Sequence, residues 1–411
     1  MLRCKIDKIY NFKECNLKYN KVYKLEYFNI YCIRYLLKIN CTFFMLNLRD
    51  KNCVRTVFVN NVIFKYDSFD FLQLTYKLYI IFCNGYFLKT NISKDYLTIS
   101  YRDNYVDDFF KIDFFSLHNT FKNSNNDFLR EDIFLNFNNI GNELVYIFDV
   151  SDSIYNAFTI NNKLFINILP NVDIEFIYTC CSKDIKSSVY RNINIFVFLD
   201  INVTCRYFVD KKLNVNSILY LDLKVIQSSY TFFYCFFLNL DSLHTKFILR
   251  IFSRGTKTKS ISHIIFIGSF IQIFDFIYDV KISNNKNNNH MGLRVVLEDF
   301  SICLFNGLVT VHPYLLGIKV NMVAEALMLS KNSVVNFKPQ LDIQSKFVKC
   351  RHSAGTYFLK YDEVFYICSR GVSRDKANNI LLICYLIEFL QCNILSNISS
   401  KYIRSVIMKG V

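Results

Sequence analysis

Apolar and polar side chains alternate over much of the chain between about residue 140 and residue 345. Three runs place apolar residues at every second position: Ile193, Ile195, Val197, Leu199, Ile201 and Val203; Leu219, Leu221, Leu223 and Val225; Phe247, Leu249 and Ile251. Alternation of period two is typical of half-buried β-strands, whose successive side chains point to opposite faces. Few helical stretches separate the runs, which excludes a doubly wound α/β fold and leaves a sandwich, a barrel or a β-solenoid.

A helical hairpin is predicted near the C-terminal end of the sequence. Asp362 is placed as the N-cap of a short helix that ends near Ser369, and Gly371 supplies the left-handed position that closes it. Ser373 is the N-cap expected for a second helix, from Arg374 to about Cys392. This second helix has a wider apolar face than one buried stripe needs, which predicts that it is buried on two sides.

Several short motifs in the same part of the chain occur in the order that one known family shows. They are RVVLED (294–299), FNG (305–307), LMLS (327–330), KPQLDI (338–343), VKCRH (348–352), Phe365-Tyr366 and SRGV (369–372). With these motifs, the last quarter to third of the chain resembles the C-terminal core of the SufB/SufD family, the scaffolds of iron–sulfur cluster assembly. KPQLDI and KCRH are more similar to SufD than to SufB. The chain departs from the family's usual Cys-Ser-His-Gly-Ala-Thr turn, because Ser353 follows His352.

The resemblance chooses among the architectures that alternation leaves open. It implies a mainly β fold with a right-handed parallel β-helix core, a mixed N-terminal region and a C-terminal helical hairpin. We place the variable N-terminal region at 1–130, the β-helix core at 131–345 and the C-terminal helical segment at 346–411. Glycine is scarce before residue 290, so asparagine is expected at left-handed corners. The Asn-rich segment 284–289 is predicted to be a loop or a local insertion of low complexity.

Cys350 and His352 are the strongest functional candidates. A thiolate and an imidazole both ligate iron in clusters. We predict that a turn carries both residues, and in extended backbone positions i and i+2 would face one site. On spacing alone such a pair is more often a packing contact. The resemblance assigns the two residues to the building of a nascent cluster, with the main role for His352 and a supporting one for Cys350.

The ligand count implies a shared site. A complete cluster usually needs four ligands, and the sequence offers no obvious set of four. We therefore expect a transient iron–sulfur cluster, held together with a second subunit. A hydrolase based on the same Cys–His pair would need an orienting carboxylate or amide and an oxyanion hole. Neither can be identified, so no catalytic residue and no enzymatic activity are predicted.

Nucleotide binding is not expected of this chain, because the sequence contains no GxxxxGK[ST] motif. The resemblance implies a separate ABC-type ATPase, SufC, that docks on the C-terminal helices. The residues predicted to contact a partner there are Phe365, Arg370, Leu386 and Phe389.

Composition limits the remaining function classes. The chain has 411 residues and a formal net charge of +15, which would suit an anionic partner. Abundant Lys, Asn, Ile, Phe and Tyr without Trp are what an AT-rich genome imposes, so the thinly spread charge is interpreted as surface lysine. The 15 cysteines include no CxxC pair and the sequence shows no signal peptide, which predicts reduced thiols.

No transmembrane segment is predicted. The most apolar stretch, Ile264–Tyr278, is shorter than the roughly 20 residues that a membrane span needs. It also contains Gln272 and Asp275. A buried pair of strands is the preferred interpretation.

Together these observations predict a scaffold subunit of a SUF-type complex that pairs with a SufB-type subunit through the β-helix and docks SufC. One alternative is a SufB-type subunit of the same complex. Another is a basic, organellar nucleic-acid-binding β-protein. Aromatic residues interleaved with Lys in a contiguous groove would favour this alternative. Our preferred hypothesis includes no nucleic-acid partner. Composition and resemblance together favour a plastid, apicoplast-like, or the cytoplasm of a reduced bacterium.

Overall fold

The computed structural model describes residues 78–102, 132–138, 143–151, 157–182, 188–213 and 216–387. The described residues all lie in one of two units of the chain, Lys65–Val411. The predicted N-terminal region is therefore described only over 78–102, and Phe389 lies outside the described residues.

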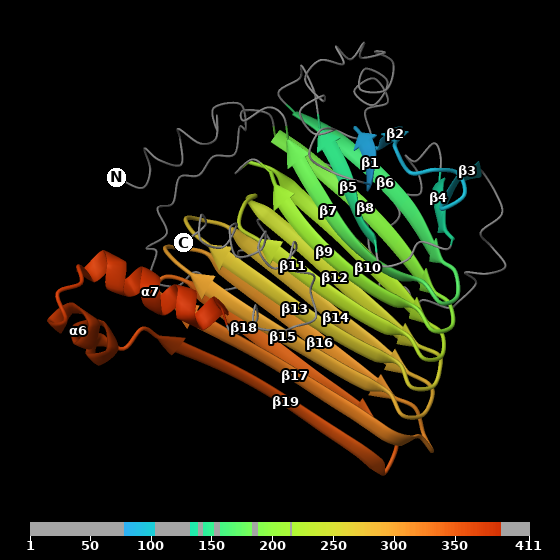
Figure 1. Ribbon diagram of the computed structural model, residues 1–411. Helices are drawn as coiled ribbons and strands as arrows, with labels where there is room; N and C mark the ends of the chain where they lie inside the picture. The colour runs from blue at the N-terminus through green and yellow to red at the C-terminus, as the bar shows by residue number, and fades with distance from the viewer. Residues whose placement is uncertain are drawn as a thin grey trace, which may run out of the picture. The chain divides into compact units, whose positions relative to one another are not determined.

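Successive strands alternate between two sheets, so that each pair of strands forms one coil of a parallel β-helix (Figure 1). Sheet A has ten strands, in the order β19-β17-β15-β13-β11-β9-β7-β5-β1-β2. They are β1 (Leu78–Cys83), β2 (Tyr86–Thr90), β5 (Glu143–Ser151), β7 (Asp173–Ser182), β9 (Thr204–Lys212), β11 (Phe232–Asn239), β13 (Lys259–Gly268), β15 (Asn288–Leu297), β17 (Leu316–Met328) and β19 (Phe347–Phe358).

Sheet B has nine strands, in the order β18-β16-β14-β12-β10-β8-β6-β4-β3. They are β3 (Leu97–Arg102), β4 (Asp132–Phe137), β6 (Ala157–Ile168), β8 (Ser188–Leu199), β10 (Ile218–Gln227), β12 (His244–Ser253), β14 (Ile273–Ile282), β16 (Ile302–Val311) and β18 (Val334–Ile343). At the start of the stack β1 pairs with β2, and β3 with β4, in antiparallel fashion. The mainly β fold, the parallel β-helix and the mixed N-terminal strands are thus confirmed.

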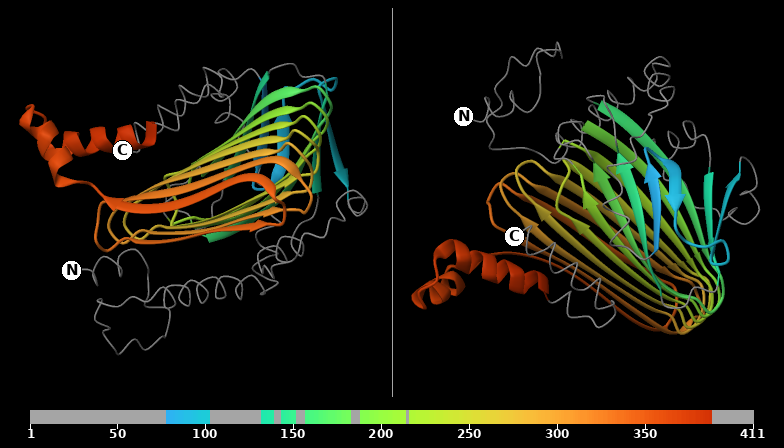
Figure 2. Two further views of the ribbon diagram at one scale, coloured as in Figure 1. Left: turned by 90° about the horizontal axis from the view of Figure 1, so that it is seen from below. Right: turned by 45° about the horizontal axis from the view of Figure 1, so that its top comes forward.

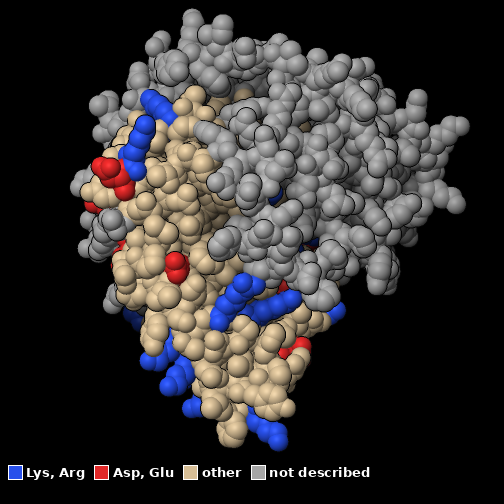
Figure 3. All heavy atoms as spheres, turned by 90° about the vertical axis from the view of Figure 1, so that its right-hand side faces the viewer, with Lys and Arg blue, Asp and Glu red and all other residues tan. Residues whose placement is uncertain are grey.

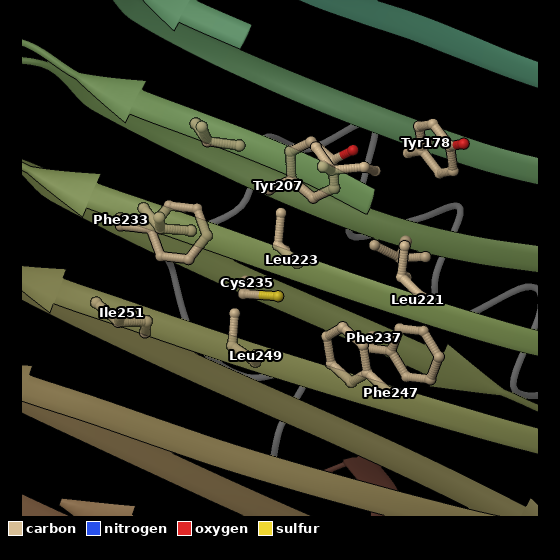
Figure 4. Packing of buried hydrophobic residues seen from close by; sticks show 14 of the residues in the cluster. Tyr178, Tyr207, Leu221, Leu223, Phe233, Cys235, Phe237, Phe247, Leu249 and Ile251 are labelled. Carbon is tan, nitrogen blue, oxygen red and sulfur yellow. The ribbon is translucent and has the colours of Figure 1, made fainter. Parts of the chain in front are cut away.

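Apolar side chains from both sheets fill the interior of the β-helix (Figure 4). Phe237 of β11 stacks on Phe247 of β12, with ring centroids 4.2 Å apart. The apolar positions in β8, β10 and β12 that the alternation predicts are buried. Ile201 is an exception, since its side chain is 53% exposed. It lies in the turn between β8 and β9, where the backbone is no longer extended and alternation does not apply.

Six turns that lead from sheet B to sheet A, from the β6–β7 turn to the β16–β17 turn, share one backbone feature, a residue with φ between 53° and 63°. These residues are Asn171, Asn202, Tyr230, Lys257, Lys286 and Tyr314. Their N–H groups link neighbouring coils: that of Asn202 donates to the carbonyl of Ser229 at 3.1 Å, and that of Tyr230 to the carbonyl of Thr256 at 2.9 Å. Asparagine therefore takes two of these corners, as expected, while Tyr and Lys take the others.

The apolar stretch 264–278 is the end of β13 and the start of β14, as the strand-pair interpretation predicts. Within the described part of the chain, no helix is long and apolar enough to cross a membrane. The Asn-rich segment is only partly a loop, because β15 begins at Asn288. Asn287 is buried, and its side chain accepts the N–H of Thr258 at 2.9 Å and donates to the carbonyl of Gly255 at 3.1 Å. Its amide thus satisfies backbone groups that have no ladder partner at the corner.

The predicted hairpin consists of α6 (Tyr361–Ser369) and α7 (Arg374–Ile387). The predicted cap position requires a correction. α6 begins one residue before Asp362, with Lys360 as N-cap and no side-chain cap bond. Asp362 lies in the first turn, where its negative charge is favourable near the positive end of the helix dipole. Gly371 has φ of 86° and closes the helix as predicted.

Gly255 offers a direct test of how closely the corners pack. A Cβ at this position would lie 2.1 Å from the backbone nitrogen of Ser229, which cannot move without breaking the neighbouring coil. We expect Gly255→Ala to lower the free energy of unfolding by about 3 kcal/mol, or to prevent folding, in chemical denaturation. Gly355→Ala is the matched control, because a Cβ there would meet nothing within 4 Å. Equal stability of the two variants would contradict the corner packing.

Candidate functional site

The β-helix finishes at β18 and β19, the last strands of sheets B and A. In the described residues, β19 pairs with β17 on one side and with no strand on the other. We call β18 and β19 the open end of the β-helix. The left view of Figure 2 turns this end toward the viewer. KPQLDI lies in β18 and VKCRH in β19. The two motifs that most resemble SufD therefore lie side by side in the same coil.

Cys350 and His352 lie within the strand β19, and the prediction that a turn carries them is wrong. Pairing with β17 continues to Phe358 and holds this segment extended, so the strand layer also runs past the predicted boundary at 345. Cys350 pairs in register with Val320, and His352 with Met322. Both of those β17 residues are buried in the core.

Register determines where the two candidate side chains point. Because strands paired in register share one pleat, Cys350 and His352 continue the inward-facing column that begins in the preceding coil. They lie about 6.6 Å apart along the strand and face the same way. Cys350 is half-buried and packs against the core, whereas His352 is exposed. The structure thus brings the two predicted residues together on one face at the open end.

The protonation state of Cys350 follows from its surroundings. Burial raises the pKa of its thiol, and a hydrogen bond with the backbone of Val320 opposes this effect only in part. The thiol is therefore mainly protonated at neutral pH in the isolated chain. Since the thiolate is the form that ligates metal, binding at Cys350 must displace this proton.

The open end is apolar around the two candidates. Partly buried side chains from both strands pack against the core there: Val335, Phe337, Leu341, Val348 and Cys350. One coil earlier the equivalent of Phe337 is Phe305, which is 2% exposed because the last coil covers it. Terminal coils of a solenoid need a cap, and an apolar end with unpaired strand edges suits a protein partner.

The described residues do not contain a complete metal site, because no group of three or more His, Cys, Asp or Glu could hold a metal ion. Cys350 and His352 supply two donors in this part of the chain. An iron–sulfur cluster takes four.

The helix α7 packs against the outer face of sheet A. Leu382 and Leu386 join an apolar cluster there with Val296 of β15 and Leu327 of β17. Tyr385 adds a polar contact, because its hydroxyl donates to the backbone carbonyl of Glu325 at 2.9 Å.

Arg294 of β15 contacts the same helix from sheet A. Its Nη1 lies 2.6 Å from Oε2 of Glu325, and its guanidinium carbon lies 4.6 Å from the ring centroid of Tyr385. Sequence reasoning did not single out Arg294, Glu325 or Tyr385 as one group. The available signal was Arg294 in the RVVLED motif.

The first helix of the hairpin, α6, buries one side chain. Val364 is its buried residue, whereas Phe365 is 59% exposed and stacks on Tyr361, with centroids 6.1 Å apart. The exposure of Phe365 keeps it available as a partner contact.

The other predicted partner contacts differ in position. Arg370 lies at the end of α6 and is exposed, with its guanidinium carbon 5.4 Å from the ring centroid of Tyr366. Leu386 has to be corrected, because it is fully buried between α7 and sheet A and offers no surface. Phe389 lies outside the described residues.

A cavity of about 670 Å³ lies between the hairpin and the neighbouring β-helix turns. Its walls include Leu240, Val296, Phe358, Val364, Arg374 and Leu382. Tyr361, one of the exposed aromatic residues of α6, also lines this cavity.

The sequence of residues 152–383 matches the family described as SUF system FeS cluster assembly, SufBD core domain. The match covers more than half of the 411 residues. The chain belongs to the SufBD family. In this SufBD chain the matched region runs to α7 and contains both Cys350 and His352.

Individual relatives match shorter segments of the SufBD chain. The iron–sulfur cluster assembly protein SufD of Escherichia coli is 27% identical over 112 residues, 27% of this chain and 26% of the relative. An iron–sulfur cluster assembly SufBD family protein of Synechocystis is 27% identical over 136 residues, 33% and 30%. The chloroplastic protein ABCI7 of Arabidopsis thaliana is 28% identical over 97 residues, 24% and 20%. The matches span a third or less of each relative's length.

Arg294 provides a test of how the hairpin is held. Arg294→Ala removes both the ion pair with Glu325 and the stacking on Tyr385, so α7 is expected to loosen while the β-helix stays folded. Hydrogen–deuterium exchange should show faster exchange in 374–387 and unchanged exchange in β9 and β11. Arg254→Ala, at an exposed corner, is the control. Unchanged exchange in α7 would show that the apolar contacts alone fix the hairpin.

Proposed function

We propose that this SufBD chain is a scaffold subunit of a SUF-type complex that assembles iron–sulfur clusters, without enzymatic activity of its own. The observation that carries the proposal is the pair Cys350 and His352 on the open end. A soft thiol and an imidazole lie there on one face, within an apolar surface of the kind that a protein partner covers.

The proposed partner at the open end is a SufB-type subunit. Two donors from this chain leave half of a cluster's ligands to be supplied by another, and the partner's strand edges would supply them next to β19. The cluster is cargo, held for a time at this interface. His352 has the main role in the proposal because its side chain is exposed, and Cys350 a supporting one because its thiol is half-buried and protonated.

The second proposed partner is a SufC-type ABC ATPase, docked on the helical hairpin. Tyr361, Phe365 and Tyr366 of α6 are 70%, 59% and 62% exposed. Exposed aromatics are typical anchors of protein-binding surfaces, and Arg370 adds a cation next to Tyr366. The sequence has no phosphate-binding loop, so this chain would transmit the ATPase's motion and not bind the nucleotide.

Within the family, a SufD-type role is preferred, and a SufB-type role is the alternative. The KPQLDI and KCRH motifs and the match with the Escherichia coli protein named SufD support the preference. The match with a chloroplastic protein supports a plastid, and the bacterial match supports the cytoplasm of a reduced bacterium.

His352 provides the test of the site. The wild-type chain and His352→Ala are co-purified with SufB-type and SufC-type subunits and reconstituted anaerobically with iron and sulfide. We expect both to form the complex, and the iron content of the mutant complex to fall several-fold because a ligand is lost.

His312→Ala is the matched control, because His312 is an exposed histidine in the turn between β16 and β17. It should retain wild-type iron content. Equal iron content in the His352→Ala and wild-type complexes would show that His352 is not a ligand. The proposed partners would then still stand. A wild-type chain that binds neither subunit would overturn the scaffold proposal itself.

A further inference from the structure

The corners where sheet B leads into sheet A carry an unusual set of left-handed residues. In the earlier coils the position is held by Asn171 and Asn202, and asparagine tolerates this backbone conformation. In four later corners it is held by Tyr230, Lys257, Lys286 and Tyr314. A bulky side chain with positive φ is a true outlier, at a cost of about 1–2 kcal/mol per residue. Strain retained at equivalent positions suggests a use for these side chains.

These four residues, which we call the corner ridge, are exposed. Tyr230 and Tyr314 are 55% and 93% exposed, and Lys257 and Lys286 between them are exposed as well. Nζ of Lys257 lies 5.0 Å from the ring centroid of Tyr230. One ridge residue per coil places neighbouring side chains about 4.8 Å apart along the stack. The ridge is thus a continuous line of cations and phenol rings.

A second line of cations runs beside the ridge on sheet A. Lys259, Lys319 and Lys349 occupy one register column of β13, β17 and β19, and all are exposed. Arg254 and Lys346 add exposed positive charge in the turns themselves. Figure 3 faces this side of the molecule, and blue Lys and Arg side chains gather on its lower part.

Large apolar side chains are exposed at the same place. Leu316 is 51% exposed and Phe347, its register partner, is 71% exposed. Leu316 directly follows the corner that carries Tyr314, and Phe347 follows the next corner, between β18 and β19. Asp342 is an exposed acidic residue near these turns. The seven exposed cations named above outnumber it, so the balance of charge here is positive.

We propose that this corner of the β-helix is a contact surface for an anionic lipid membrane. Lysines of the ridge and of the neighbouring column bind the headgroups, while Tyr314, Leu316 and Phe347 enter the interfacial layer. Tyrosine with apolar and basic neighbours is the composition that membrane interfaces favour. Single-stranded nucleic acid is bound in positively charged grooves, whereas these side chains project from a convex edge between two sheets. The proposal does not depend on the scaffold role.

The test is co-sedimentation of the full chain with vesicles of phosphatidylcholine, with or without phosphatidylglycerol. The wild type should bind only the anionic vesicles, and less at high salt. Lys257→Asn with Lys286→Asn should lower the partition coefficient by roughly 30-fold, since two surface charges are lost. Thermal stability should be unchanged or higher, because asparagine fits the left-handed backbone better. Tyr314→Ser should weaken binding and leave the salt dependence in place.

Lys331→Asn with Lys360→Asn is the matched control, because both lysines are exposed away from the corner and the loss of charge is the same. It should bind as the wild type does. Absence of wild-type binding to anionic vesicles would overturn the proposal. An equal loss of binding in both double variants would also overturn it, because net charge alone would then explain the effect. Tighter binding of a single-stranded oligonucleotide, lost in Lys257→Asn with Lys286→Asn, would assign the corner to nucleic acid instead.

Discussion

In-register parallel pairing between successive coils is the constraint on which the rest of this structure depends. From β5 to β19 in sheet A, the described strands of each coil pair with those of the next, and the residues opposite each other keep one direction. A side chain in one coil therefore points in the same direction as the side chain opposite it in the preceding coil. Met322 faces the core, so His352 faces the same way. His352 lies in the last coil, however, where no further coil covers the core.

The same constraint explains why the two proposed protein contacts lie where they do. A stack of coils satisfies its backbone groups everywhere except at its ends and corners. The open end has unpaired edges and apolar side chains, which suit another β-rich partner. The hairpin is different: it is attached to the outer face of sheet A by Arg294, Tyr385 and apolar contacts, and it leaves Phe365 and Arg370 exposed. The open end and the hairpin are therefore separate surfaces of one chain.

Local pattern predicted most of the fold, because alternation and helix-closing signals act over a few residues. The buried runs in β8, β10 and β12, the strand pair at 264–278 and the closure at Gly371 follow from such signals. Choosing a β-helix over a sandwich required the family resemblance, because period two is common to all these folds.

What the sequence did not predict depends on contacts between distant residues. Cys350 and His352 were expected in a turn, but β17 holds them extended through pairing some 30 residues away in sequence. Leu386 was expected on a docking surface, but sheet A buries it, and helical periodicity alone cannot tell which of two apolar sides meets the chain's own core. Ile201 fits the alternation and is nevertheless exposed, since the strand ends before it.

The central claim, that the open end is where a SufB-type subunit binds, is tested most directly by hydrogen–deuterium exchange of the isolated chain and of its complex with that subunit. The account predicts that amides in 334–358 exchange quickly in the isolated chain and become protected in the complex, while those in β9 and β11 stay unchanged. A complex in which β18 and β19 exchange as they do in the isolated chain would contradict it.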